Sequence, residues 1–293
     1  MTKPSKGIWL APLRGVTVRT FRAVFGNAMI EAGFDGAFAP FIPANSGFRF
    51  SRRLFSDILP EEQSSGLEVV PQVIGKDPHA LREWCKAVKD LGYRRVDLNA
   101  GCPFPMIRKK GRGSGLMRTP DALDRMLEAG CDEMGIGGFS LKTRLGVERS
   151  DEILNLMPII NRYPLAALTV HARTAKQMYE GGVDIDAFRA VASVAEVPLI
   201  YNGDAIVGDA LGDGLMVGRR FISGLALRND ALALLARYVS ASRTELSGDA
   251  PVLGRMKELL SYWCREKSWQ KLWPVIKICR SVDEIASVLN LHL

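Results

Sequence analysis

Eight short apolar runs recur along the first 218 residues, and most of them are followed by a segment with helical periodicity. The runs are 7–12, 34–39, 68–75, 95–100, 139–144, 165–171, 197–203 and 213–218. Short runs that are apolar throughout are typical of parallel strands that are buried on both faces and joined by crossover helices. Eight is also the number of strands that closes a (β/α)8 barrel. The sequence therefore predicts an α/β fold of the TIM-barrel type.

The connections between these runs support this fold, with one exception. Helical periodicity is found in 17–32, 77–91, 120–134, 151–162 and 184–194. Between Asn202 and Leu215, however, only 12 residues join the last two runs. That length is at the lower limit for a crossover between parallel strands. We therefore expect a truncated or missing helix in this connection.

The strand pattern stops after about residue 225, and the rest of the chain has only helical patterns. These patterns cover 231–243, 252–267 and 282–293. We expect a barrel domain over residues 1–235 and a small all-helical domain over residues 236–293. Trp263, Trp269 and Trp273 lie close together in the second domain. They could form part of an RNA-binding surface, or they could fill the core of the helical domain.

The composition argues against several classes of protein, among them membrane proteins, disulfide-rich proteins and metalloproteins. No apolar run reaches the length of a membrane span, and the first residues lack the pattern of a signal peptide, so we expect a cytoplasmic protein. The five cysteines include no Cys-x-x-Cys pair, which argues against a disulfide framework and against a metal site. The net charge of +7 favours a polyanionic partner. We expect a monomer.

The ends of the apolar runs carry the residues of greatest interest, because active sites of such barrels lie at the carboxyl ends of the strands. These ends hold Pro12, Leu13, Gln72, Asn99, Cys102, Lys142, Arg144, His171, Arg173, Asn202, Gly203, Asp204, Gly218 and Arg219. Polar or turn-forming residues therefore occur at nearly every strand end. The pattern predicts one polar site at the mouth of the barrel.

Some of these residues indicate a particular chemistry. A lysine at a strand end is costly to bury without a partner, so Lys142 should face an anionic ligand. The fragments NGD (202–204) and GRR (218–220) combine unobstructed backbone with a guanidinium group, which suits a phosphate. A lone cysteine is more often a buried apolar residue. Cys102, however, directly follows a strand between Gly101 and Pro103, and this position favours a reactive thiol.

At this point the chain resembles a known family, the tRNA-dihydrouridine synthases. The resemblance rests on APLRG, PQVIG, DLNAGCP, SLKTRLG, TVHARTAKQMY, IYNGD and MVGRR, followed by RMKELLSYW in the helical region. These motifs lie at separate strand ends and occur in the order of the family. Together they cover nearly the whole chain.

The resemblance implies an enzyme that reduces a D-loop uridine of tRNA to 5,6-dihydrouridine, with FMN as cofactor and NADPH as reductant. Cys102 matches the general acid that protonates C5 of the uracil. The residues implied for FMN are Pro12, Leu13, Arg14, Gln72, Asn99, Lys142, His171, Asn202, Gly203, Asp204, Gly218 and Arg219. The residues expected to contact RNA are Arg49, Arg52, Lys109, Lys110, Arg144, Arg173 and Lys257.

The chain departs from the family pattern at two places in the barrel. Leu13 replaces the usual methionine after Ala-Pro, a change that roughly conserves volume. The short connection after Asn202 lies between the two halves of the expected phosphate site and could weaken FMN binding. Two other functions therefore stay open. One is an FMN-dependent reductase of a free small molecule, and the other is an RNA-binding module that has lost FMN.

Overall fold

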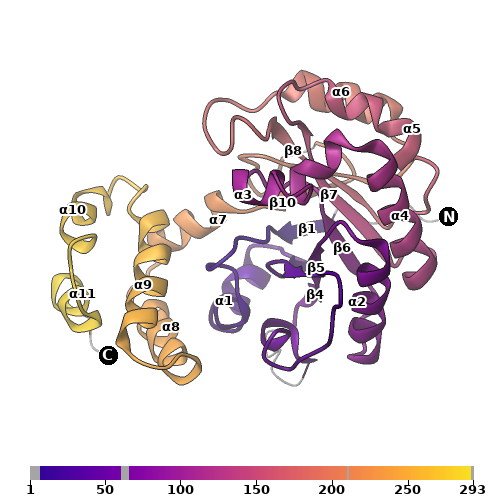
Figure 1. The fold of residues 1–293 in the computed structure, drawn as a ribbon. Coiled ribbons are helices and arrows are strands. Elements are labelled where there is room, and N and C mark those ends of the chain that lie inside the picture. The colour runs from indigo at the N-terminus through magenta and orange to yellow at the C-terminus, as the bar shows by residue number, and fades with distance from the viewer. Residues whose placement is uncertain (1–6, 61–65, 210, 292–293) are drawn as a thin grey trace.

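The computed structural model describes residues 7–60, 66–209 and 211–291. They form a barrel of parallel strands surrounded by helices, with a group of helices from the C-terminal part of the chain at one side (Figure 1). The strands are β1 (Gly7–Leu10), β2 (Gly36–Phe38), β3 (Ile42–Pro43), β4 (Glu68–Val70), β5 (Gln72–Ile74), β6 (Val96–Asn99), β7 (Phe139–Gly146), β8 (Leu168–Thr174), β9 (Leu199–Asn202) and β10 (Gly214–Val217). Each of the eight predicted runs overlaps at least one of them.

The ten strands make a closed ring of eight segments. Strands β4 and β5 are the two halves of one predicted run, separated by Pro71, which has no N–H to donate. Strand β4 pairs with β2, whereas β5 pairs with β6 and with the short β3. From β6 the pairing continues in chain order to β10, which pairs with β1, and β1 pairs with β2. Every pair is parallel, as the predicted barrel requires.

The barrel has an inner and an outer core. Inside the ring, buried apolar side chains form a separate small cluster, made of Trp9, Ala11, Phe38, Val70, Ala167, Ile200 and Met216. A much larger apolar cluster fills the space between the strands and the helices. Strands buried on both faces have no room for solvent-facing polar residues along their length. This explains why they are visible in the sequence as continuous apolar runs.

Most predicted crossover helices are present. They are α1 (Arg19–Glu31), α2 (Pro78–Asp90), α4 (Pro120–Met134) and α6 (Ile185–Val194). The predicted helix over 151–162 is wrong as a continuous helix, because it is divided into a 3-10 turn at Glu152–Asn155 and a single turn α5 (Met157–Ile160). Pro158 cannot donate a backbone hydrogen bond to Leu154, which interrupts the helical ladder at this point.

The expected loss of a helix between the last two strands is confirmed for the described residues. Residues 203–209 and 211–213 contain turns but no helix. Asp213, at the end of the loop, forms two hydrogen bonds with the first residue of β9. Its backbone N–H donates to Leu199 O at 2.7 Å, and its carboxylate accepts from Leu199 N at 2.9 Å. The loop therefore passes directly from the end of β9 to the start of β10.

The C-terminal helices pack beside the barrel. They are α7 (Arg219–Gly224), α8 (Ala231–Glu245), α9 (Asp249–Trp263), α10 (Trp273–Ile276) and α11 (Val282–Leu289). Helix α8 contacts α1 of the barrel, and α9 contacts α7. The Glu245 carboxylate at the end of α8 accepts hydrogen bonds from Thr20 of α1 and from Arg255 of α9. The division of the chain into two domains at residue 236 stays a prediction.

The tryptophans of this region favour the interpretation as core residues. Trp263 is fully buried, and its ring packs edge to face on Trp269 with 5.2 Å between ring centroids. Trp269 and Trp273 are partly buried against the same apolar cluster. The Trp269 indole N–H also donates to Ala226 O at 3.0 Å. These rings therefore join the helices to each other.

The described residues contain neither a membrane-spanning helix nor a metal site. Among these residues no helix combines the length and apolar character needed to cross a membrane. Within the same ranges, no group of three or more His, Cys, Asp or Glu side chains has a geometry suited to a metal ion. The five cysteines, all described, are free and buried.

The packing of α4 on the sheet leads to a stability prediction. A methyl group added at Gly130, in the middle of α4, would overlap the ring of Phe139 on β7. We expect Gly130→Ala to lower the free energy of unfolding by about 1–3 kcal/mol, because overpacked cores must shift neighbouring atoms. The matched control is Gly254→Ala in α9, where a methyl group meets nothing within 4 Å and alanine is the better helix former. Urea unfolding that found the two variants equally stable would contradict this account.

Candidate active site

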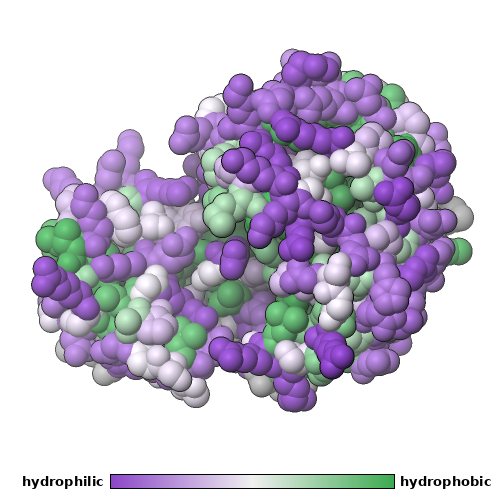
Figure 2. All heavy atoms as spheres, viewed as in Figure 1, coloured by the Kyte–Doolittle hydropathy of each residue, from purple (hydrophilic) through white to green (hydrophobic). Residues whose placement is uncertain are grey.

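A cavity of about 1240 Å³ lies at the carboxyl ends of the barrel strands. One wall consists of the strand ends and the loops after them, including the Cys102 loop. The opposite wall comes from the C-terminal region and consists of Leu246, Pro251, Gly254, Arg255, Glu258, Tyr262 and Arg265. Figure 2 shows the molecular surface indented between the C-terminal helices and the barrel. The cavity is therefore bounded by both parts of the chain.

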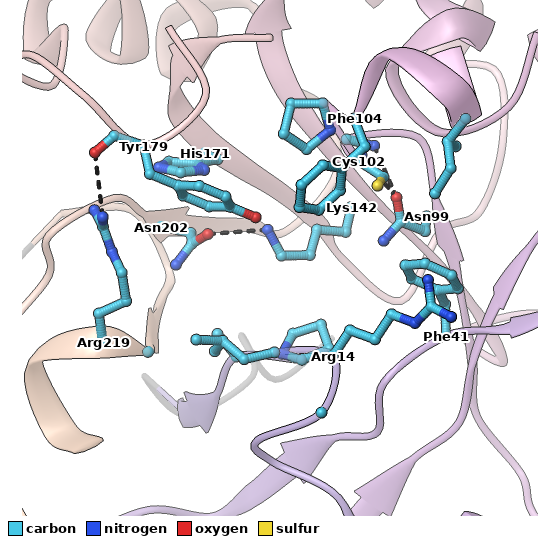
Figure 3. Close-up of a pocket in the computed structure, with 18 of the residues that line it drawn as sticks. Arg14, Phe41, Asn99, Cys102, Phe104, Lys142, His171, Tyr179, Asn202 and Arg219 are labelled. Carbon is cyan, nitrogen blue, oxygen red and sulfur yellow. Dashed lines mark hydrogen bonds between the residues drawn. The ribbon is translucent and has the colours of Figure 1, made fainter. Parts of the chain in front are cut away.

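The structure brings together most of the strand-end residues singled out in the sequence. The cavity is lined by Pro12, Leu13, Arg14, Asn99, Cys102, Lys142, Arg144, His171, Asn202, Gly203, Asp204, Gly218 and Arg219. Gln72 and Arg173 are the exceptions, because both side chains are buried and neither lines the cavity. Figure 3 shows how the labelled side chains surround a common space.

Cys102 is held in place through its backbone. The Asn99 side-chain oxygen accepts hydrogen bonds from the N–H groups of Gly101 and Cys102, at 3.1 and 2.9 Å. On the other side, the Ser114 hydroxyl donates to Cys102 O at 2.9 Å. Gly113 also packs against Cys102 so closely that a methyl group on it would lie 2.8 Å from the Cys102 Cβ. The thiol therefore has a defined position in the cavity wall.

The surroundings of Cys102 keep its thiol protonated. Burial raises the pKa of the Cys102 thiol above its ordinary value, although the Phe104 backbone N–H and Arg144 act in the opposite direction. A thiol normally titrates near pH 8.5, so Cys102 carries its proton at neutral pH. In chemical terms, it can donate a proton to a group bound in the cavity.

A buried chain of hydrogen bonds positions Asn99. The Asn99 amide donates to Gln72 Oε1 at 2.8 Å, and the Gln72 amide donates to Asp97 Oδ2 at 2.7 Å. Ser140 donates to the other oxygen of Asp97 at 2.7 Å. Burial raises the pKa of Asp97 to about 6, against the effect of the two hydrogen bonds from Gln72 and Ser140. Gln72 thus supports Asn99, and its expected contact with FMN stays a prediction.

Lys142 places a cation in the centre of the cavity. Its ammonium group donates to Asn202 Oδ1 at 2.9 Å, and the Asn202 amide in turn donates to Met216 O at 2.7 Å (Figure 3). Burial and the nearby Arg144 lower the pKa of Lys142 to about 8, although Asp97 and Cys102 act in the opposite direction. Among the described residues, no carboxylate forms a direct ion pair with Lys142. The site therefore favours an anionic group beside this ammonium.

His171 is neutral and has a defined tautomer. Burial lowers its pKa well below the ordinary value, and Arg144, Lys142 and Arg173 add to this effect. Arg173 Nη1 lies 3.3 Å from His171 Nε2. Because a guanidinium can only donate, Nε2 must accept this hydrogen bond and Nδ1 must carry the proton. His171 can therefore offer an N–H group without adding charge.

Arg144 and Tyr179 lie together at one edge of the cavity. Arg144 is buried and donates to three carbonyl oxygens, those of Gly101, Thr174 and Met178. The exposed Tyr179 ring lies between two guanidinium groups, with Arg144 at 5.2 Å and Arg219 at 5.3 Å from its centroid. Arg144 is thus linked both to the Cys102 loop and to the loop after β8.

The loops after β9 and β10 meet around Asp204. Its carboxylate forms ion pairs with Arg173 and with Arg219, the latter at 2.7 Å. Arg219 also donates to Tyr179 O at 3.2 Å, as drawn in Figure 3. The two guanidinium groups lower the pKa of Asp204 against the effect of burial, so the carboxylate is ionised.

The residues expected to contact RNA fall into two groups. Arg49, Arg52, Lys109 and Lys110 are exposed on loops. Arg144 and Arg173 are buried. Lys257 donates to the carbonyl oxygens of Lys277 and Cys279, which fixes the end of α10. The structure gives Arg144, Arg173 and Lys257 contacts within the protein, and direct contact with RNA stays a prediction for all seven.

Sequence reasoning missed several residues that line the cavity. Tyr179, Arg220, Arg255 and Tyr262 belong to quoted motifs but were not singled out. Phe104, directly before the short helix α3 (Pro105–Arg108), and Met106 within it were also missed; they line the cavity and are 48% and 79% exposed. A helical pattern cannot reveal which of its polar residues faces another part of the chain.

The sequence model of the dihydrouridine synthase family matches residues 9–219. The chain belongs to the dihydrouridine synthase family. The matched range contains every strand except the first two residues of β1 and every strand-end residue described above. The family match ends at Arg219, so α8 to α11 lie outside it.

Curated relatives agree with this family. The chain is 29% identical over 219 residues to tRNA-dihydrouridine synthase B of Vibrio cholerae, a match that covers 72% of this chain and 66% of the relative. It is 32% identical over 230 residues to a probable tRNA-dihydrouridine synthase of Rhizobium leguminosarum, covering 72% and 67%. The matches thus span about two thirds of each relative's length.

Solved structures agree with the barrel fold. Morphinone reductase in complex with tetrahydroNAD has a TM-score of 0.53 at 11% identity, over 76% of this chain and 85% of that one. The old yellow enzyme homologue of Zymomonas mobilis has a TM-score of 0.54 at 12% identity, over 74% and 85%. At such low identity the likeness establishes the fold of this dihydrouridine synthase family member and nothing about its substrate.

Proposed function

We propose that this protein reduces a uridine of tRNA to 5,6-dihydrouridine, with FMN as bound cofactor and NADPH as reductant. The observation that carries the proposal is the convergence of Cys102, Asn99, Lys142 and His171 on one cavity, in a chain of the dihydrouridine synthase family. The names of the relatives supply the substrate class. The D-loop is the proposed location of the uridine.

The residues around the cavity fit a flavin. Pro12 to Arg14 form one side of the space, and Gly218 packs so closely on this segment that a methyl group there would lie 3.1 Å from Ala11 Cβ and 3.2 Å from Leu13 Cδ1. Lys142 offers an ammonium without a direct ion pair, which suits the negative charge of a reduced flavin. FMN, when bound, would supply the two-electron chemistry that amino-acid side chains lack.

Within this function, Cys102 acts as the general acid. Its thiol is protonated, fixed by Asn99 and Ser114, and directed to the cavity. We propose that it gives its proton to C5 of the uracil as hydride is added at C6. Lys142 holds positive charge nearby, and Asn202 keeps that ammonium in place. His171 supplies a neutral hydrogen-bond donor.

The size and walls of the cavity support a large substrate. A stacked base cannot reach the floor of a barrel, so the target uridine must be turned out of the RNA. An unpaired loop costs least to open in this way. The α9 wall adds Tyr262 to the cavity and extends it beyond the strand ends, as a substrate larger than a free small molecule requires. The exposed Arg49, Arg52, Lys109 and Lys110 are proposed to contact RNA phosphates.

The absorption spectrum of the purified protein, with FMN added, tests this function. We expect flavin bands that bleach under NADPH without oxygen and return when unmodified tRNA is added. Bleaching reversed by a free enone but not by tRNA would indicate a small-molecule reductase. Failure to bind any flavin, with tRNA binding intact, would support the RNA-binding module instead.

Lys142 predicts a pH dependence for the reaction. Because its pKa is lowered to about 8, the ammonium is charged below this pH and loses its proton above it. We expect the rate at which NADPH bleaches bound FMN to fall as the pH rises through about 8, because the ring of the oxidised flavin is uncharged and only the charged ammonium stabilises the negative charge that reduction creates. Lys142→Arg should move this fall to higher pH. A profile that is flat to about pH 10, where an ordinary lysine titrates, would contradict the assignment.

A further inference from the structure

Two exposed apolar side chains at the rim of the cavity have no role in the reaction proposed so far. They are Phe104 and Met106, and both line the cavity. Within the described part of the chain, neither side chain belongs to an apolar core. Single exposed apolar residues are common on protein surfaces, but this pair adjoins the Cys102 thiol (Figure 3). Both side chains therefore lie where a bound substrate would cover them.

The backbone holds Phe104 at a fixed place beside the thiol. Its carbonyl oxygen accepts hydrogen bonds from two N–H groups of α3, both at 3.0 Å, and its own N–H acts on the Cys102 thiol. Pro103 and Pro105 flank it, and each proline ring fixes its own φ angle. The Cα atoms of residues 102 and 104 are at most about 7 Å apart, because only two peptide units join them. A nucleotide in contact with Cys102 therefore has its nearest neighbours within reach of the Phe104 ring.

The rest of this loop is cationic, which narrows the chemistry of the partner. Lys109 and Lys110 are exposed, and Lys110 and Arg112 line the cavity. Among the described residues, the buried Nε atom of Arg112 has no hydrogen-bond partner. Cations call for phosphates, whereas exposed apolar side chains call for an apolar surface. A nucleic-acid strand offers both, since it carries a phosphate and a flat base in every nucleotide.

The extrusion of a uridine creates an apolar surface of this kind. When the target base leaves its stack, the bases on either side lose a stacking partner, and this loss is part of the cost of extrusion. Proteins that unstack bases often place an apolar side chain in the opened step. A phenylalanine ring suits this place because it can stack on any base, and the flexible methionine can adapt to an irregular gap.

We propose that Phe104, with Met106 beside it, packs against the bases that flank the extruded uridine and replaces their lost stacking partner. This inference rests on the proposed function, because it requires tRNA as substrate. The cations of the loop hold the phosphates, and the Phe104 ring favours the state in which the uridine lies in the cavity. Phe104 thus positions the substrate and takes no part in flavin reduction.

The experiment separates the reduction of the flavin from the reduction of uridine. Protein reduced by NADPH is mixed without oxygen with unmodified tRNA, and the return of the flavin bands gives the rate of uridine reduction. We expect Phe104→Ala to lower this rate at low tRNA concentration by about 10- to 100-fold, the effect of losing one contact between a base and an aromatic ring. NADPH should bleach the variant as fast as the wild type, which also shows that it is folded and binds FMN.

Three further variants test whether the ring acts by stacking. Phe104→Leu keeps an apolar side chain without a ring and should lose less than Phe104→Ala. Met106→Ala should also have a smaller effect. Phe104→Trp keeps an aromatic ring and should retain most of the rate. Its added indole should be quenched when tRNA binds, because stacking on a base quenches indole fluorescence; the wild type, with its five tryptophans, gives the reference signal.

The matched control is Ile136→Ala. Ile136 is 91% exposed, lies just before β7 at the amino ends of the strands, and does not line the cavity. Removing this apolar side chain should leave both rates unchanged. The control therefore distinguishes the place of Phe104 from the mere exposure of an apolar residue.

The remaining outcomes separate this inference from the proposed function. Uridine reduction at the wild-type rate in Phe104→Ala, or an equal loss in bleaching by NADPH, would overturn the inference and leave the function intact. A wild-type dimer that dissociates in Phe104→Ala would show that the pair covers a second copy of the chain instead. If tRNA does not restore the flavin bands of the wild type, the proposed function fails and this inference fails with it.

Discussion

Replacing Cys102 by alanine should remove nearly all uridine reduction while leaving a yellow, FMN-bound protein. The thiol is the proton donor of the proposed reaction, and the loop that carries it is held at the cavity wall by hydrogen bonds to the backbone of Cys102. Removing the sulfur therefore leaves the loop in place. General acids of this kind contribute about 10²- to 10⁴-fold in rate. We expect a loss of that size in kcat, measured as dihydrouridine formed per enzyme.

Two further variants make this experiment decisive. Cys131→Ala removes another buried thiol, on α4, which does not line the cavity, and should keep wild-type activity. Cys102→Ser keeps a hydroxyl group at the same position, but a hydroxyl is a much weaker acid and should stay far below the wild type. NADPH should still bleach the flavin in Cys102→Ala. Wild-type turnover in that variant would refute the role of Cys102 as general acid.

The strand-end residues of the site could be predicted from the sequence for a simple physical reason. Parallel strands buried on both faces are continuous apolar runs, so the point where each run stops marks one edge of the sheet. Closing the sheet into a barrel brings all these points together. Lys142 and His171 are therefore neighbours in the cavity although 28 residues separate them in the sequence.

Other parts of the site depend on contacts that leave no local pattern. Tyr179 reaches the cavity only because the loop after β8 folds back between Arg144 and Arg219. Gln72 lies at the first position of β5 and not at a strand end, and its side chain turns to Asp97 and Asn99. The α9 wall depends on the packing of α8 on α1, which joins segments more than 200 residues apart. Such placements follow from tertiary packing alone.

The short connection between β9 and β10 has one feature that the sequence predicts and one that depends on tertiary contacts. Its length predicted the loss of a helix, because a crossover needs a minimum number of residues. The sequence also raised the concern that this loss would damage the phosphate site. In the structure an ion pair between Asp204 and Arg219 links the loops after β9 and β10. The effect of the short connection on FMN binding stays a prediction.

The second large effect should come from Lys142→Met, which exchanges an ammonium for an apolar side chain of similar length. We expect the variant to bind FMN but to lose about 10²- to 10³-fold in the rate at which NADPH bleaches the flavin, as when one preorganised charge-stabilising group is removed from an active site. Rapid-mixing absorption measurements without oxygen give this rate directly.

The same variant should not be destabilised, and this separates a functional lysine from a structural one. A lowered pKa means that the folded protein disfavours the charged form of Lys142, so below about pH 8 its charge opposes folding. Lys142→Met removes that cost, and we expect its free energy of unfolding at pH 7 to equal or exceed that of the wild type. Lys142→Arg keeps the charge and should retain much more of the bleaching rate. A Lys142→Met protein that bleaches at the wild-type rate, or that unfolds more easily, would show that this lysine serves the fold and not the reaction.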